Sequence, residues 1–432
     1  MLIRFNFKNF KSFRDSAVLD MSASKITEHS DHVISMGKEK VLPISVIYGA
    51  NASGKSNVYQ AFEYMSDYIV NSFKFGGDDD SKQGSEFEYM KPTPFLFDSL
   101  TLDQESLFEI YFMDANDSAI KIYNYGFAVN AQGVTKEWLK SKSKTAKEFK
   151  SIFYRSKSEN ILDLNGLPAK YHENIRVSLE NEVLIVSLGA KLKISKLKIV
   201  RDWFWSNEFA DFGDPVESLF LSRMLPKGFV DDDKVQESVV KFFSSFDDSI
   251  IGFKIEKVLS DSDKKNEEHY KIDAIHKMVN STENATIPLR FESDGTLKMF
   301  ALYPRLQSVL EKGSTLFIDE LNARLHPLLV RNFVNVFLDS NLNPNHAQLV
   351  FTTHDTWQLS NELLRRDEIW FVDKDKNGVS VLYTLADVVD QEGIKIRKDE
   401  NYEKNYLQGK YNATPLLKPI GKIFQTDKGE NK

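Results

Sequence analysis

The chain has 432 residues, of which 41% are hydrophobic and 28% are charged. These are the proportions of an ordinary globular protein, so a chain that is disordered throughout is excluded. Its 56 Lys and Arg against 63 Asp and Glu give a net charge of −7, which excludes a uniformly basic nucleic-acid binder. Because the chain has no cysteine, disulfides, thiolate metal sites and cysteine nucleophiles are excluded as well.

Charges interrupt the apolar run at the N-terminus, unlike in a signal peptide. No stretch approaches the roughly 18 consecutive apolar residues that a membrane-spanning helix requires. We therefore expect a cytoplasmic protein that does not contact a membrane.

Strands are predicted where apolar residues alternate with polar ones or form short unbroken runs. In chain order they are residues 3–7, 43–48, 107–113, 119–129, 250–258, 269–275, 315–318, 348–352, 368–372 and 379–383. The almost continuous apolar run at 43–48 is typical of a parallel strand covered on both faces. Helices are expected at 56–70, through much of 158–285, from 297 and at 327–339. The glycine-rich segment 76–86 and the last twenty residues are predicted to be loops or loosely held chain.

Residues 49–56, Gly-Ala-Asn-Ala-Ser-Gly-Lys-Ser, fit the phosphate-binding loop (P-loop) pattern of a glycine, four residues and Gly-Lys-Ser. The glycines let the backbone N–H groups surround a phosphate, and the following helix adds the positive end of its dipole. We expect Lys55 to reach the β- and γ-phosphates and Ser56 to bind Mg²⁺. The nucleotide-binding residues predicted here are Gly49, Asn51, Ala52, Ser53, Gly54, Lys55, Ser56 and Asn57. A glycine-rich turn without a ligand is the weaker alternative.

The segment 315–320 is an apolar strand that ends in Asp319 and Glu320. Alone, this is a common strand end, but together with a P-loop it predicts a Walker B motif. Asp319 is then expected to hold Mg²⁺ directly or through water, and Glu320 to polarise the attacking water. No Asn-Lys-x-Asp element for guanine recognition is present, which favours ATP over GTP.

Two further segments carry candidate residues. His354 follows the strand 348–352 and is predicted to contact the γ-phosphate, although a histidine at a strand end is usually a polar cap. Ser293 and Gly295 precede an apolar helical run. Their loop is interpreted as a helix N-cap formed by Ser293 or Asp294, as a binding site for the γ-phosphate held by another subunit, or as both.

The order of these motifs resembles the RecF, SMC and OLD-type ATPases of the ABC class. The resemblance rests on Phe7-Lys8-Asn9-Phe10-Lys11-Ser12-Phe13 ahead of the P-loop, on the loop at 292–296, on the strand ending in Asp-Glu, and on Thr353-His354-Asp355. It is greatest to the OLD-like AAA ATPases of bacterial phage-defence loci, which include the RloA and AbiLi group and the AriA subunit of the PARIS system. The loop reads Glu-Ser-Asp-Gly-Thr instead of the Leu-Ser-Gly-Gly-Gln of transporters, which fits OLD-like relatives. Asn322-Ala323-Arg324 stands where relatives often carry Asp or Ser.

The resemblance implies an α/β fold with an ABC/SMC-head-like P-loop ATPase core, a mixed sheet and a mainly helical insertion. It divides the chain into residues 1–139 and 286–390 as the two halves of the core, 140–285 as the insertion for dimerisation or partner binding, and 391–432 as a tail. It further implies an ATP- and Mg²⁺-dependent homodimer or larger even assembly. Two nucleotides would lie between one subunit's P-loop and the other's signature loop, the segment 292–296. In this reading Glu320 is the catalytic base, and Lys55 and His354 complete the catalytic set.

The same resemblance implies an ATP-hydrolysing switch that controls an effector encoded nearby, such as a Toprim-type nuclease. Two alternatives stay open. One is a RecF- or SMC-like DNA-binding ATPase in repair or maintenance, in which the basic stretches 140–157 and 191–201 contact phosphates instead of forming solvated faces. The other is a scaffold that binds ATP and barely hydrolyses it. No convincing acidic cluster for a Toprim nuclease follows His354 in this chain.

Overall fold

The structure is a computed structural model. It describes residues 1–75, 88, 90–114, 121–143, 145–221, 225–244, 246, 248–258, 269–390 and 392–414. The loop predicted at 76–86 and nearly all of the last twenty residues lie outside this part of the chain. Within it, no helix combines the length and the apolar character that crossing a membrane requires.

A seven-stranded antiparallel sheet forms one layer of the molecule, in the order β10-β9-β8-β7-β6-β1-β2. Its strands are β1 (Leu2–Lys8), β2 (Ala17–Asp20), β6 (Ser106–Met113), β7 (Ile122–Asn130), β8 (Gly133–Lys142), β9 (Lys150–Ser156) and β10 (Ile161–Asp163). Short connections join β7 through β10 into a meander, as hairpin connections do. The predicted strands at 3–7 and 107–113 are confirmed, and β7 confirms the described part of the strand predicted at 119–129, of which 119 and 120 lie outside the described residues.

A six-stranded sheet has the order β11-β15-β16-β5-β17-β18, and all its neighbours are parallel except β17 and β18. The strands are β11 (Glu208–Asp211), β15 (Thr315–Asp319), β16 (Gln348–Thr352), β5 (Ile44–Gly49), β17 (Ile369–Lys374) and β18 (Ser380–Thr384). Every residue of β5, β15 and β16 is buried, which explains their unbroken apolar sequences. The parallel strand at 43–48, the mixed sheet and the α/β class are confirmed.

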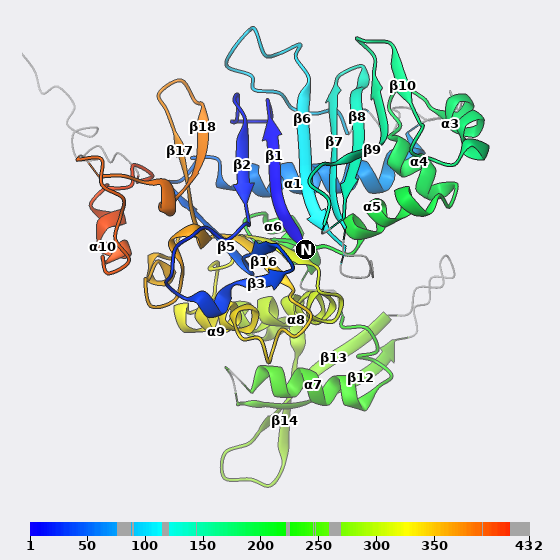
Figure 1. Cartoon of the computed structure of the whole chain (residues 1–432). Helices are drawn as coiled ribbons and strands as arrows, with labels where there is room; N and C mark the ends of the chain where they lie inside the picture. The colour runs from blue at the N-terminus through cyan, green and yellow to red at the C-terminus, as the bar shows by residue number, and fades with distance from the viewer. Residues whose placement is uncertain are drawn as a thin grey trace, which may run out of the picture.

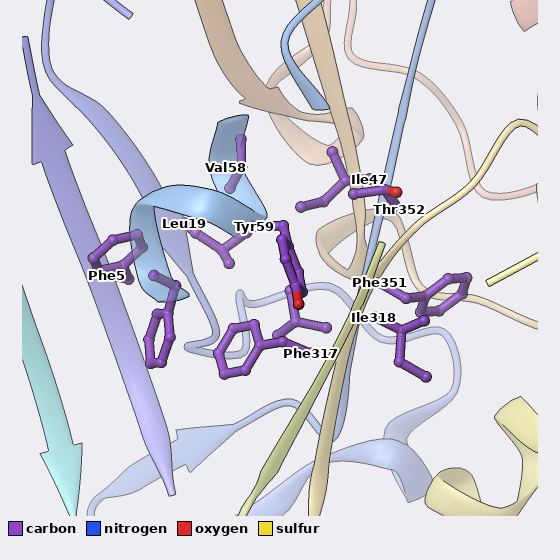
Figure 2. A pocket seen from close by; sticks show the side chains of 11 residues that line it. Phe5, Leu19, Ile47, Val58, Tyr59, Phe317, Ile318, Phe351 and Thr352 are labelled. Atoms are coloured by element: carbon purple, nitrogen blue, oxygen red, sulfur yellow. The ribbon is translucent and has the colours of Figure 1, made fainter. Parts of the chain in front are cut away.

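Helices cover both faces of this six-stranded sheet (Figure 1). Helix α1 (Lys55–Asn71) lies between the two sheets, while α8 (Asp294–Lys312) and α9 (Pro327–Leu338) pack on the other face. Figure 2 shows a small apolar cavity lined by Val58 and Tyr59 of α1 and by Phe317 of β15. The core side chains that hold α1 in place are therefore shared between both sheets.

The segment 140–285 combines helices with strands. Its elements, besides β8 to β11, are α3 (His172–Ser178), α4 (Ile185–Lys191), α5 (Ser195–Trp205), α6 (Pro215–Leu221), α7 (Asp233–Phe243), β12 (Ile250–Val258), β13 (His269–Lys277) and the start of β14 (Asn284–Pro288). Strands β12, β13 and β14 form a small sheet beside α7, which confirms the predicted β pair (Figure 1). The predicted boundary at 139/140 falls inside β8, because the antiparallel meander continues past it. Strand β11 joins the core sheet beside β15.

The remaining elements are short. They are β3 (Ile34–Met36), β4 (Glu39–Val41), α10 (Tyr402–Leu407) and the 3-10 helices η1 (Ser30–His32), η2 (Ser72–Lys74), η3 (Ala169–Tyr171), η4 (Leu289–Phe291), η5 (Thr356–Gln358), η6 (Arg366–Glu368) and η7 (Leu385–Asp387).

Helix α1 carries a carboxyl group, Glu63, that is half-buried. Burial raises its pKa to about 7, and the negative charge of Glu217 adds to the effect. A carboxyl whose pKa rises on folding contributes stability at low pH, and that contribution disappears as the pH rises through about 7. The Tyr59 hydroxyl donates a hydrogen bond to Glu63 Oε1 at 3.1 Å. Glu63→Gln keeps an oxygen that can accept this hydrogen bond.

We expect Glu63→Gln to raise the free energy of unfolding by about 2 kcal/mol at pH 8 and to change it little at pH 5. Urea denaturation of both proteins at the two pH values measures this difference. A variant that is equally stabilised at both pH values would show that the proton on Glu63 is not the cause.

Candidate functional site

The P-loop connects the end of β5 to the start of α1, which is the context that its sequence predicts. Gly54 is the N-cap of α1 and has φ 111°, a value that favours glycine. Gly49 is also required, because a Cβ there would lie 2.4 Å from the Val372 carbonyl oxygen. Asn51 and Ala52 are exposed at the tip of the loop, and Ser53 is buried below it. Among the N–H groups of the first turn of α1, that of Asn57 donates to the Gly54 carbonyl oxygen at 3.1 Å. N–H groups at the start of a helix lack partners four residues back, which makes this end of α1 suited to an anion.

Lys55 is buried, and its Nζ donates to the carbonyl oxygens of Gly49 and Ala50, both at 3.0 Å. Burial lowers its pKa to about 8, while the carboxylates of Asp319 and Glu320 oppose this shift. Because both carboxylates act on the charge of Lys55, the P-loop lysine lies close to the two acidic residues of the Walker B motif. The order β15-β16-β5 brings them together at the carboxyl ends of parallel strands.

Asp319 ends β15 with its side chain buried and accepts hydrogen bonds from the hydroxyl groups of Ser56 and Thr352. Burial raises the pKa of this carboxyl, and the two hydrogen bonds act in the opposite direction. Carboxylate and hydroxyl oxygens are ligands that Mg²⁺ prefers. Because Ser56 and Asp319 are close enough to share a hydrogen bond, their oxygens fit a single Mg²⁺ ion.

Glu320 follows in a left-handed backbone conformation, with φ 53°. Its N–H donates to Thr352 Oγ1 at 2.9 Å, and this bond turns the chain away from β15. The side chain is 36% exposed and its Oε1 lies 3.8 Å from His354 Nε2. Burial lowers the pKa of His354, and the positive charge of Lys55 lowers it further. The three residues predicted to be catalytic are thus neighbours.

The signature loop begins α8. Ser293 is the N-cap, and its Oγ accepts from the Thr296 N–H at 3.1 Å, so the N-cap interpretation is confirmed. Asp294 pairs with Arg324 at 3.5 Å, and the Cα of Gly295 packs against the Arg324 backbone. Among the described residues, no hydrogen bond or ion pair joins residues 293–295 to the P-loop. Binding to a nucleotide held by another subunit remains a prediction.

Residues 44–356 match a protein family described as "AAA domain, putative AbiEii toxin, Type IV TA system". The matched segment is well over half of the chain and contains all the candidate residues above, from Gly49 to His354. The chain belongs to this AAA family. No curated protein matches the chain. One similar solved structure is "Crystal structure of the SmcHead bound to the C-winged helix domain of ScpA", which is 14% identical with a TM-score of 0.41 and covers 91% of this chain and 99% of that one.

Family membership confirms the prediction of an AAA protein with a P-loop. The closer relation to RloA, AbiLi and AriA stays a prediction. The family match begins at β5, so it leaves out the N-terminal motif that contains Ser12. In this AAA protein the Ser12 hydroxyl accepts from Asn57 Nδ2 and from Ser380 Oγ, both at 2.7 Å. The side chain of Asn57, which is predicted to bind nucleotide, therefore connects the start of α1 to the N-terminal motif through a hydrogen bond to Ser12.

A methyl group at Gly54 would disturb this packing. Its Cβ would lie 2.6 Å from both Ser12 Oγ and Ser380 Oγ, in addition to the strain of its positive φ. We expect Gly54→Ala to weaken ATP binding about tenfold or more, since a loop distortion that costs about 1–3 kcal/mol has that effect. Titration with a fluorescent ATP analogue measures the loss.

Gly393→Ala is the matched control, because Gly393 also has a positive φ, 78°, but no atom lies within 4 Å of its added Cβ. It should bind ATP like the unmodified AAA protein. Equal affinity of all three proteins would show that the contacts with Ser12 and Ser380 do not set the shape of the P-loop.

The core of this protein contains a residue that the sequence patterns did not single out, Lys298 of α8. It is 5% exposed, and its Nζ donates to the carbonyl oxygens of Glu320, Leu321 and Ala323 at 3.1, 2.7 and 3.0 Å. Burial lowers its pKa to about 7, against the attraction of the Glu320 carboxylate. The sequence signal for a buried lysine is that Lys298 is the one charged residue inside the apolar run 297–302.

The sequence predicts no specific contact for Asn322, yet its side chain fixes the segment around His354. Its Oδ1 accepts from the Thr353 hydroxyl at 2.9 Å and from the His354 N–H at 3.2 Å. The turn after Walker B and the turn after β16 are therefore connected directly. A displacement of either one is expected to move the other.

The basic stretches that could bind DNA are partly neutralised in this AAA protein; Lys144 lies outside the described residues. Their partners include acidic side chains and a carbonyl group: Lys142 with Glu39, Arg155 with the buried Glu137, Lys198 with Asp202, and Lys196 with the Gly166 carbonyl. DNA binding stays a prediction, which the salt dependence of binding to duplex DNA tests.

Proposed function

We propose that this AAA protein binds ATP with Mg²⁺ and hydrolyses it as a molecular switch. The supporting observation is the convergence of Lys55, Glu320 and His354 at the carboxyl ends of β5, β15 and β16. Helix α1 starts at the same point, so phosphate groups placed there meet both a lysine and unpaired N–H groups.

Each residue has a distinct task in this proposal. Lys55 exchanges the carbonyl oxygens of Gly49 and Ala50 for phosphate oxygens, which removes the cost of its burial. Mg²⁺ held by Ser56 and Asp319 neutralises charge on the phosphates when it is bound. Glu320, whose carboxylate is accessible to water, accepts the proton of the attacking water.

His354 is proposed to hydrogen-bond the γ-phosphate and so to distinguish ATP from ADP. In the structure its Nε2 faces Glu320, and its backbone N–H is fixed by Asn322. A change at the γ-phosphate is therefore transmitted to the turn 320–324, which contacts the signature loop through the Arg324–Asp294 pair. This connection gives the switch a physical route between nucleotide and subunit interface.

The proposed assembly is a homodimer in which Ser293 and Gly295 of each subunit complete the other's ATP site. Such an assembly should form with ATP and Mg²⁺ and dissociate with ADP. Analytical ultracentrifugation and phosphate release, measured on one preparation with either nucleotide, test the assembly and the hydrolysis together. A monomer without ATP turnover under all conditions would overturn the proposal.

The contribution of the second subunit can be tested by mixing two inactive variants. Lys55→Ala disables the P-loop, and Ser293→Asp keeps an N-cap while placing negative charge where the phosphate should bind. In an equal mixture, half of the dimers contain one of each and have one intact site of two, so activity should recover to roughly a quarter of the unmodified level. No recovery would place both residues in a site within one subunit.

We further propose that the switch controls an effector protein encoded nearby, in a bacterial antiviral system. The support is the described motif order and a family whose description names a toxin–antitoxin system. Growth of a bacterial host that expresses this chain with and without the neighbouring gene is the test. Growth arrest by this chain alone would contradict a separate effector and would favour a toxin role for the chain itself.

A further inference from the structure

A cluster of two histidines and an aspartate lies at η1, outside the proposed ATP site. His29, Asp31 and His32 each offer a ligand atom, and these atoms lie within 4.8 Å of one another. The imidazole rings have their centroids 4.9 Å apart. Within the described residues, no other group of three potential ligands converges in this way. None of these residues has a task in the proposed hydrolysis of ATP.

The outer contacts of both histidines fix which nitrogen is free. His29 Nε2 lies 2.8 Å from the Asn361 carbonyl oxygen. Because a carbonyl oxygen only accepts, Nε2 must carry the proton, and Nδ1 of the neutral ring retains its lone pair. His32 Nδ1 lies 3.0 and 3.2 Å from the two carboxylate oxygens of Glu368. An ionised carboxylate only accepts, so opposite ionised Glu368 the neutral ring carries its proton on Nδ1 and Nε2 of His32 retains the lone pair.

This arrangement is the one that metal-binding histidines have in proteins. Such a histidine donates its other N–H to a carboxylate or a backbone carbonyl, which orients the ring and raises the basicity of the ligand nitrogen. Both forms occur here, with Glu368 behind His32 and the Asn361 carbonyl behind His29. Neither outer partner belongs to the cluster, so they are evidence independent of its ligand spacing.

We propose that His29, Asp31 and His32 bind a divalent transition metal of the zinc class. Two imidazoles and one carboxylate suit Zn²⁺ better than Mg²⁺ or Ca²⁺, which prefer oxygen ligands. Tetrahedral zinc ligands lie about 2.0–2.2 Å from the ion and therefore about 3.3–3.6 Å from one another. The cluster must contract from its present spacing of up to 4.8 Å when it binds the ion, and Asp31 is the exposed member of the three.

Charge and support around the site are consistent with a dication. Asp31 contributes an exposed carboxylate, while the charge of the nearby Arg365 is offset by Asp367, which it contacts through two hydrogen bonds of 2.9 Å. The backbone carrying His29 is held by Arg365 Nη1, which donates to the Glu28 carbonyl oxygen at 2.6 Å. Glu368 itself is completely buried and accepts from the Arg365 N–H at 2.9 Å.

The position of the site assigns it a structural role. Glu368 immediately precedes β17, whose first residue, Ile369, pairs with Val46 of β5. Three residues later Val372 pairs with Gly49 at the start of the P-loop. All three ligands lie at η1, and the contact between His32 and Glu368 connects them to the start of β17, at the end of the sheet opposite the nucleotide. The ion would therefore stabilise η1 and its contact with the sheet without taking part in hydrolysis.

Metal binding by the full chain, freed of metal with a chelator, tests this proposal without reference to ATPase activity. We expect one Co²⁺ per chain by isothermal titration, visible absorption bands of a low-coordinate cobalt–histidine site, displacement by Zn²⁺ and a raised melting temperature. Asp31→Asn and His29→Gln should each remove the absorption bands. Glu368→Gln should weaken binding about 10- to 100-fold, because it removes only the outer carboxylate.

His172→Gln is the matched control, since His172 also contacts a backbone carbonyl, that of Leu167 at 3.1 Å, but lies outside the cluster. It should bind Co²⁺ like the unmodified chain. Because Asp31 is exposed, Asp31→Asn leaves the fold intact and its result is decisive. Absence of cobalt binding, or binding that survives both Asp31→Asn and His29→Gln, would overturn the proposal.

Discussion

Glu320→Gln is expected to reduce ATP turnover by about 10²- to 10⁴-fold while leaving ATP binding unchanged. The amide keeps the size of the side chain but cannot accept the proton of the attacking water. Lys55, Ser56 and Asp319 are untouched, so the groups proposed to bind the phosphates and Mg²⁺ remain. The backbone N–H of residue 320 still donates to Thr352, which preserves the turn.

Single-turnover hydrolysis and solution mass, measured with ATP, examine this variant. Because hydrolysis no longer converts the bound ATP to ADP, the ATP-bound dimer should dissociate more slowly than that of the unmodified protein. Glu362→Gln is the matched control, as Glu362 is exposed and has no assigned role. Equal turnover in Glu320→Gln and the unmodified protein would remove Glu320 from the mechanism.

Lys298→Met is expected to have the second-largest effect, on both stability and catalysis. Methionine has a similar length but donates no hydrogen bond, so the carbonyl groups of Glu320, Leu321 and Ala323 lose their shared partner. An unsatisfied buried polar group costs about 1–3 kcal/mol, and we expect a loss of about 3 kcal/mol in the free energy of unfolding.

The catalytic effect of Lys298→Met follows from geometry. Two of the three carbonyl groups flank the positive-φ turn that aims the Glu320 side chain, and a small displacement of a catalytic group costs on the order of 10²-fold. Because Lys298 does not contact the P-loop, kcat should fall while KM for ATP changes little. Lys298→Arg retains charge and donors and should recover part of the activity.

Lys312→Met provides the control for this prediction. Lys312 lies on the same helix, but its side chain is half-exposed; its Nζ donates to the Ser308 hydroxyl at 2.8 Å and lies 3.9 Å from the Glu208 carboxylate. It should leave kcat and stability nearly unchanged. A Lys298→Met variant that loses stability with unchanged kcat would limit Lys298 to a structural role.

The predictions that the structure confirmed depend on short, local patterns. The strand–loop–helix around the P-loop and the strand ending at Asp319 are each encoded within about a dozen residues, and steric and hydrogen-bonding rules act at that range. The fully buried strands could be identified because burial on both faces requires an unbroken apolar sequence. Ser293 could be identified as an N-cap because that task is local to one helical turn.

Other features depended on residues that are distant in the sequence. Lys298 could not be predicted to hold the turn after Walker B, because its partners are 22 to 25 positions away and a lysine in a helix is usually exposed. Strand β11 pairs with β15 more than a hundred residues later, so the edge of the core sheet was not recognised.

The sequence by itself determined the nucleotide-binding motifs, because they are recorded in local residue order, and the order of those motifs carried the resemblance that implied the fold class. Only the tertiary structure decided that Ser12 contacts Asn57 at the start of α1, and that Glu368 contacts His32, which lies 336 positions earlier. Hydrogen bonds of this kind depend on where the packing of two sheets and their helices places each side chain. No pattern in a single segment contains that information.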